Sequence, residues 1–152
     1  MEEYKNIAVN KKAFHEYEII EKYEAGISLL GSEVKSARAG KVNFTDSFVD
    51  LRTGEAILLN AHISPYVNAG LNNHEPLRNR KLLLHRQELK KLIKKTTQRG
   101  FTVVPLRMYF TKKGLIKIEI ALAKGKHSYD KKQALKERDQ KRDMARELKN
   151  YK

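Results

Sequence analysis

Residue types that can perform catalysis are present, but their spacing does not form a recognisable catalytic site. None of the five histidines stands in a His-x-x-x-His or His-Glu-x-x-His spacing, and there is neither a Gly-x-Ser-x-Gly motif nor a phosphate-binding loop. The chain has no cysteine, which excludes thiolate nucleophiles, disulfides and cysteine-ligated zinc. Asp46 and Asp50, four residues apart on a predicted strand, would share a face suited to a metal ion for phosphodiester chemistry, although two solvated carboxylates near a turn is the favoured interpretation. We therefore predict a protein that is not an enzyme and has no metal or cofactor.

Binding of an anionic partner is better supported than catalysis. Lysine and arginine total 32 against 18 aspartates and glutamates, and the formal net charge of +14 suits nucleic acid or an acidic membrane face. We expect cations from a short helix, a polar loop and the end of the last strand to line one anionic track: Lys35, Arg38, Arg78, Arg80, Lys81, Lys124 and Lys126. No apolar run approaches the ~18 residues of a membrane span. The N-terminus lacks the order of a signal peptide, so we expect a cytoplasmic protein with no membrane partner.

The pattern of apolar residues predicts that a small β-sheet protein carries these cations. Residues with the period or composition of strands occupy five segments: Tyr17–Leu29 (bent near Gly26), Val42–Leu51, Ala56–Ile63, Phe101–Phe110 (with Pro105 at an edge or bulge) and Ile116–Leu122. Two helices are expected, one over Gly31–Gly40, capped by Ser32 and ended by Gly40, and one over His85–Arg99. Residues 65–80 are expected to form a polar loop. About six antiparallel strands with two inserted helices predict a mainly β fold, an OB-like closed or nearly closed barrel over residues 1–123.

Residues 124–152 differ from the rest of the chain and are predicted to form a separate basic tail. They carry 11 basic and 5 acidic side chains but few large apolar ones, too few to offset the entropy of ordering. From residue 130 onward the tail has no glycine or proline, and opposite charges recur at helical spacing. We expect a monomer whose tail is disordered when free and helical against an anionic groove. A solvated helix packed on its own domain is the alternative.

Several motifs in a fixed order resemble one known family. The run Gly31-Ser32-Glu33-Val34-Lys35-Ser36-Ala37-Arg38-Ala39-Gly40-Lys41 resembles the Gly-x-Glu-Val-Lys-Ser-x-Arg-x-Gly-Lys signature of the SsrA-binding protein (SmpB) family. The segments 10–17, 80–85 and 123–126, followed by Asp130-Lys131-Lys132, match the same family in the same order. The resemblance runs from about Ile7 to the C-terminus. The family often has Asp-Lys-Arg at 130–132, and some members have Asn at the position of His85.

The resemblance implies an OB-type barrel that binds the transfer-RNA-like domain of transfer-messenger RNA (tmRNA, or SsrA RNA). The protein would be an RNA-binding adaptor that delivers this RNA to stalled ribosomes for trans-translation. The implied RNA-binding residues are Glu33, Lys35, Arg38, Leu83 and His85, with Asn10, His15, Tyr17, Asn43, Lys81, Lys124 and Lys126 as further candidates. The tail would enter the vacant mRNA channel near the decoding centre of the small subunit, with Asp130, Lys131 and Lys132 engaging the ribosome. Elongation factor Tu would be a partner through the charged tmRNA.

Glu33 needs a separate interpretation, because a carboxylate repels phosphate. At an RNA surface it would accept a hydrogen bond from a base amino group or orient Arg38. Alternatively, it is an early-helix glutamate favoured by the helix dipole. Two other functions stay open for the whole chain: a ribosomal protein with a basic extension, and a metal-dependent nuclease using Asp46 and Asp50.

Overall fold

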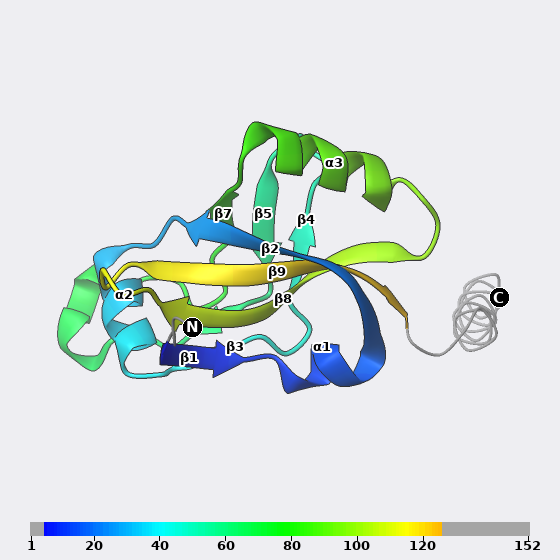
Figure 1. Ribbon diagram of the computed structural model, residues 1–152. Coiled ribbons are helices and arrows are strands. Elements are labelled where there is room, and N and C mark those ends of the chain that lie inside the picture. The colour runs from blue at the N-terminus through cyan, green and yellow to red at the C-terminus, as the bar shows by residue number, and fades with distance from the viewer. Residues whose placement is uncertain (1–4, 126–152) are drawn as a thin grey trace, which may run out of the picture.

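A long antiparallel sheet that curls on itself forms the body of the protein in the computed structural model, which describes residues 5–125 (Figure 1). Its seven strands lie in the order β1-β8-β9-β2-β7-β5-β4. They are β1 (Lys5–Val9), β2 (Tyr17–Ile27), β4 (Phe48–Asp50), β5 (Ala56–Leu59), β7 (Arg80–Leu83), β8 (Phe101–Phe110) and β9 (Ile116–Gly125). A second, two-stranded sheet pairs β3 (Val42–Asn43) with β6 (His62–Ile63). The helices are α1 (Lys11–Glu16), α2 (Gly31–Arg38), α3 (Arg86–Thr96) and the 3-10 helix η1 (Val67–Asn72).

The sheet closes almost completely into a barrel. Its last strand, β4, packs against β8, yet within residues 5–125 no hydrogen-bonded ladder joins these two strands. A groove of about 410 Å³ follows the seam and is lined by side chains that include Phe48, Ile93 and Phe101. The mainly β, antiparallel fold is therefore confirmed, and its barrel is the nearly closed form of the two that we expected.

Strands β2, β8 and β9 supply most of the core. Ile118, Ile120 and Leu122 of β9 are at most 1% exposed, and they alternate along the strand with side chains on the other face. Helix α3 covers one end of the barrel with the fully buried Leu92. Burial of each such side chain contributes about 1.5–3 kcal/mol. The period-2 pattern that predicted β2 and β9 thus reports which side chains face this core.

Two predicted strands are each divided by a residue in the left-handed conformation. Asp46, with a φ of +62°, separates β3 from β4 within the segment 42–51, and Asn60, also at +62°, separates β5 from β6 within the segment 56–63. Asp and Asn tolerate this conformation better than other side chains do, because their short polar groups bond locally. Asp46 therefore precedes β4 and does not belong to the same strand as Asp50. The prediction that the two carboxylates share a strand face suited to a metal ion is wrong.

Other predicted bounds need smaller corrections. The count of about six strands and two helices is too low, because two predicted strands are divided and because β1, β7 and α1 were not predicted. These three depend on distant partners: β1, for example, pairs with β8 about a hundred residues later. Pro105 lies at a register shift in β8, as expected for a bulge. Strand β9 continues to Gly125, so Lys124 belongs to the sheet and not to a tail that starts at 124. No helix within residues 5–125 is long and apolar enough to cross a membrane.

Helix α2 ends as predicted but begins differently. Gly40 follows the helix with a φ of +74°, and its N–H donates to the carbonyl of Ala37 at 2.9 Å. Ser32 does not cap the helix. Instead, the Glu33 carboxylate turns back to accept a hydrogen bond from the N–H of Leu30 at 2.8 Å.

The conformation of Gly40 makes a specific prediction for stability. Gly40→Ala forces a Cβ into the left-handed region, and we expect a loss of about 1–2 kcal/mol in the free energy of unfolding. Gly31→Ala is the matched control, since Gly31 starts the same helix and has no atom within 4 Å of an added Cβ. The control should be neutral or slightly stabilising. Urea titration of both variants measures the difference, and equal midpoints would contradict the prediction.

Candidate nucleic-acid interface

A buried carboxylate on α2 is bound by two arginines from the segment that leads into β7. Glu33 is 0% exposed. Its Oε2 accepts a hydrogen bond from Arg80 Nε at 2.5 Å, and its Oε1 accepts one from Arg78 Nη2 at 2.6 Å. Together with the bond from the Leu30 N–H, both oxygens are used within the protein. We call Glu33, Arg78 and Arg80 the ion cluster.

Arg80 is also fully buried, and its other nitrogens bind backbone carbonyls. Nη1 donates to Ala61 O at 2.8 Å and Nη2 donates to Pro76 O at 3.2 Å. Buried charges are tolerated when they are paired and hydrogen-bonded in this way. The ion cluster therefore ties α2 to β7 and to the loop that precedes β7.

The surroundings of Glu33 keep it ionised. Burial is the largest influence and acts to raise the pKa of Glu33, but the hydrogen bonds from Arg78 and the Leu30 N–H, with the charge of Arg80, outweigh it and lower the pKa. Burial lowers the pKa of Arg80, and Glu33 opposes that shift. Because the pKa of Glu33 is lowered on folding, its contribution to stability is present above the unfolded-state pKa and is lost as the pH falls through the folded-state pKa.

These contacts correct the sequence-based role of the ion cluster. Glu33 has no exposed surface with which to accept a hydrogen bond from a base, and its partners are Arg78 and Arg80 instead of Arg38. Arg80 is likewise buried, so it does not line an anionic track. No local sequence pattern indicates these ion pairs, because the partners of Glu33 lie 45 and 47 residues away in the chain.

Two exposed cations project from α2, and we call Lys35 and Arg38 the α2 surface. Lys35 and Arg38 project from the helix, and the Nζ of Lys35 lies 5.3 Å from the centroid of the Tyr66 ring. Lys81 belongs to β7, whose backbone meets the chain just before α2, where Ser28 N–H donates to Lys81 O at 2.9 Å. Its side chain points to the other face of β7 from Arg80, and its Nζ lies 3.2 Å from Glu55 Oε1 in the β4–β5 turn. Lys35 and Arg38 therefore share a helix whose position the ion cluster sets, whereas the Lys81 charge lies apart from them.

Leu83 and His85 extend the same strand beyond Lys81. Leu83 is 56% exposed although it is a large apolar side chain, and it lies opposite Gly26 in the pairing of β2 with β7. A methyl group at Gly26 would come within 3.3 Å of Leu83 Cβ, so the glycine leaves room for this side chain. His85 is exposed just before α3, and its N–H donates to Glu88 Oε1 at 3.2 Å. An exposed apolar side chain beside cations suits a base or ribose next to a phosphate.

A second group of predicted residues lies at the opposite end of the sheet, near α1 and the last residues of β9 (Figure 1). His15 is exposed on α1, and Tyr17 starts β2 opposite Gly125 of β9. Lys124 is exposed, with its Nζ 5.7 Å from the ring centroid of Phe101. The structure therefore separates the predicted residues into two regions and does not join them in one track.

Asn10 and Asn43 both hold local structure. Asn10 is 8% exposed; its side chain accepts from Ala13 N–H at 3.2 Å at the start of α1 and donates to Pro105 O at 2.8 Å. The Oδ1 of Asn43 accepts from Thr45 N–H at 2.8 Å in the turn after β3. Capping of α1 and stabilisation of this turn are functions that the list of expected RNA contacts did not include.

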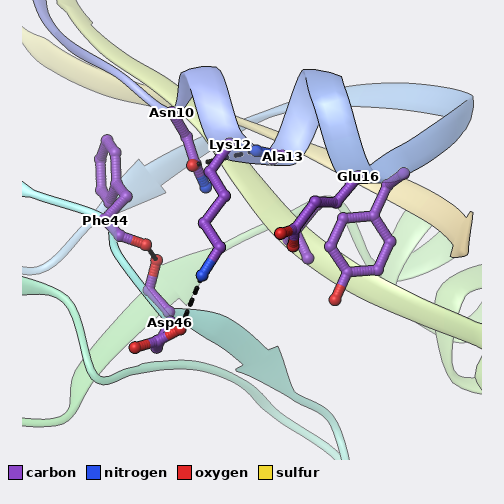
Figure 2. Close-up of a pocket in the computed structure, with 9 residues that line it drawn as sticks. Asn10, Lys12, Ala13, Glu16, Phe44 and Asp46 are labelled. Carbon is purple, nitrogen blue, oxygen red and sulfur yellow. Dashed lines mark hydrogen bonds and ion pairs between the residues drawn. The ribbon is translucent and has the colours of Figure 1, made fainter. Parts of the chain in front are cut away.

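A small cavity of about 60 Å³ lies between α1 and the turn that follows β3. Figure 2 shows Lys12 reaching across this cavity toward Asp46. Lys12 Nζ lies 3.3 Å from Asp46 Oδ1. Asp50 is bound to a different cation, since Arg52 Nε donates to it at 3.0 Å, and the hydrogen bonds from Arg52 lower the pKa of Asp50. Within residues 5–125, no three His, Asp or Glu side chains cluster as metal ligands. Nothing in this geometry favours the nuclease hypothesis.

Four predicted residues lie outside the described part of the chain: Lys126, Asp130, Lys131 and Lys132. Their proposed contacts, and the expected behaviour of the tail, stay predictions.

Comparison with known families decides the identity. The family described as "SmpB protein" matches residues 7–150. This chain belongs to the SmpB family. Two relatives named SsrA-binding protein, from Symbiobacterium thermophilum and a Nostoc species, are 55% and 58% identical to it over 142 and 151 residues. The aligned parts cover 93% and 99% of this chain and 90% and 97% of the relatives.

The SmpB fold is also found in a solved structure described as "tmRNA-SmpB: a journey to the center of the bacterial ribosome". It has a TM-score of 0.69 at 51% sequence identity, and the match covers 82% of this chain and 87% of that one. The resemblance inferred from the Gly31–Lys41 run and its flanking motifs is therefore confirmed.

The ion cluster predicts that replacing Glu33 lowers the stability of the protein much more than replacing an exposed glutamate does. Glu33→Ala leaves Arg80 charged and buried without its partner, and we expect a loss of about 3–5 kcal/mol in the free energy of unfolding. The control is Glu55→Ala, which removes an exposed ion pair to Lys81 and should change stability little. Urea titration at neutral pH compares the two, and similar midpoints would contradict a structural role for Glu33.

Proposed function

We propose that this SmpB-family chain binds the tRNA-like domain of tmRNA through the α2 surface and delivers the RNA to stalled ribosomes, as an adaptor that catalyses no reaction. One observation carries the proposal: on one short helix the signature run places Glu33, which is buried in the ion cluster, beside the exposed cations Lys35 and Arg38. The matching relatives are named for SsrA binding, and the matching structure is described as tmRNA-SmpB in the bacterial ribosome.

The α2 surface suits recognition of a folded RNA through its backbone. Lys35 supplies a point charge for a phosphate, whereas Arg38 offers a planar fork that binds phosphate or a base edge with two hydrogen bonds. Lys81 is a further candidate, which pairs with Glu55 in the free protein. Leu83 and His85 supply an apolar and a planar surface at the edge of these cations. Double-helical RNA is recognised largely by shape and backbone, with base contacts confined to loops and bulges. Affinity should consequently fall steeply with salt.

The opposite end of the sheet is the origin of the C-terminal segment. Because Tyr17 pairs with Gly125, the last described residue of the chain lies beside the end of α1. In this proposal His15, Tyr17 and Lys124 contact the RNA that the tail meets, and Asp130, Lys131 and Lys132 engage the decoding centre and mRNA channel. The tail folds into a helix there, and elongation factor Tu joins through the charged tmRNA. The free protein is a cytoplasmic monomer.

The first test removes a charge from the α2 surface. Arg38→Ala should weaken binding of the tRNA-like domain by ~1–3 kcal/mol, because a bidentate contact is lost while the exposed side chain leaves the fold intact. Binding is measured by fluorescence anisotropy at one stated salt concentration. The control is Arg52→Ala in the β4–β5 turn, where the side chain is 85% exposed and lies outside the α2 surface. Unchanged affinity of the Arg38 variant, with the control also unchanged, would contradict the proposal.

The second test separates RNA binding from ribosome engagement. Deletion of residues 127–152 should leave affinity for tmRNA nearly intact and abolish tagging of chains made from a messenger without a stop codon. Alanine at Asp130, Lys131 and Lys132 together, in the full chain, should reduce tagging without the loss of length. Tagging by the deleted protein would show that the tail has no role at the decoding site. A ribosomal protein would instead remain on subunits that are not stalled.

A further inference from the structure

Two apolar side chains at the tip of the loop between β6 and β7 have almost no contact with the body. Val67 is 83% exposed and Leu71 is 106% exposed, and both lie on η1. Gly70, with a φ of +55°, interrupts η1 between these two residues. A single exposed apolar side chain is ordinary, but two in one short loop beside exposed cations are not explained by folding. We call residues 65–79 the η1 loop.

One asparagine closes the tip of the η1 loop. Asn73 Oδ1 accepts from Tyr66 N–H at 2.9 Å, and Asn73 Nδ2 donates to Tyr66 O at 2.8 Å. This reciprocal pair closes the tip around Val67 and Leu71. Part of the entropy of ordering the tip is therefore lost during folding, which lowers the entropy that binding must remove.

Buried contacts then fix the base of the loop to the α2 region. His74 is 5% exposed, and its ring nitrogens lie 2.8 Å from Ser32 Oγ on α2 and 2.8 Å from Ile63 O. Pro76 O accepts from Ile63 N–H at 3.0 Å and from Arg80 of the ion cluster. The loop and α2 consequently form one unit, and the position of the tip relative to Lys35 is set by the fold.

Charge around the tip points to RNA as the partner. Lys35 lies over the Tyr66 ring at the start of η1, and the carbonyl of Lys41 accepts from Ser64 N–H at 3.1 Å just before the loop. Arg78, at the far end of the loop, is 32% exposed but is already paired with Glu33, so Lys35 supplies the positive charge that a phosphate would meet here. A surface that holds a phosphate at Lys35 brings the adjoining ribose and base within reach of a neighbouring side chain. Apolar side chains there suit the face of an unstacked base.

We propose that the tip of the η1 loop is a base-contacting part of the RNA interface. Val67 and Leu71 pack on an unstacked base or ribose of the bound RNA while Lys35 binds the phosphate beside it. This inference rests on the proposed function and adds to it two residues with no charge.

The test is the double variant Val67→Ser/Leu71→Ser in the full chain. Since these side chains are exposed, we expect thermal unfolding to be unchanged and affinity for the tRNA-like domain of tmRNA to fall about tenfold. The slope of log affinity against log salt should stay that of the wild type, because no ionic contact is lost. Lys35→Ala should instead reduce the magnitude of the slope by about 0.7–0.9.

A matched control and a chemical readout make the result decisive. Ile20→Ser changes an apolar side chain that is 43% exposed on β2, outside the η1 loop, and should leave affinity unchanged. Probing with a base-modifying reagent should show a loop base that the wild type protects and the double variant exposes. If the double variant binds like the control, the inference is overturned while the proposed function stands. If it binds RNA normally but associates less with ribosomes, the tip contacts another partner and the inference is also overturned. If the wild type does not prefer this RNA to another folded RNA of equal length, the proposed function fails.

Discussion

The hydrogen-bonded ion pair between Glu33 and Arg80 is the interaction on which the arrangement of α2 depends. An eight-residue helix is too short to be stable alone, so tertiary contacts must hold it. Here the contact is a fully buried carboxylate that receives two guanidinium groups and a backbone N–H. Two charges withdrawn from water are costly unless every polar group is satisfied, which makes the pairing specific in geometry. The buried ion pair fixes the position of α2, and the helix in turn fixes the position of its exposed cations, Lys35 and Arg38.

The sheet relates this helix to the origin of the C-terminal segment. Strand β2 starts at Tyr17, opposite Gly125, and ends at Ile27, shortly before α2. The ten steps between the eleven residues of β2, at about 3.3 Å each, span at most roughly 33 Å, and the curvature of the strand shortens this length (Figure 1). One paired strand thus fixes the separation of the two predicted RNA-contacting regions. The ladders to β9 and β7 resist bending of this strand. A spacing between two RNA partners would thus be built into the body and would not depend on the tail.

Several features followed from local sequence patterns because they need no distant partner. Alternation predicted β2 and β9, and Gly40 predicted the end of α2, since a left-handed residue after a helix favours glycine. The Gly31–Lys41 run, with its flanking motifs, identified the family. The excess of lysine and arginine predicted an anionic partner, although it did not distinguish cations that bind RNA from cations that hold the fold.

That distinction belongs to the tertiary structure. Arg80 and Lys81 are adjacent in the chain, yet one is fully buried and the other exposed, because successive side chains of β7 point to opposite faces and the Glu33 carboxylate lies on only one of them. Left-handed Asp46 and Asn60 divided two strands that apolar content alone had left whole. Composition and periodicity therefore determined the fold class and the kind of partner. Burial determined which charges face that partner, because it depends on side chains that meet from positions more than forty residues apart.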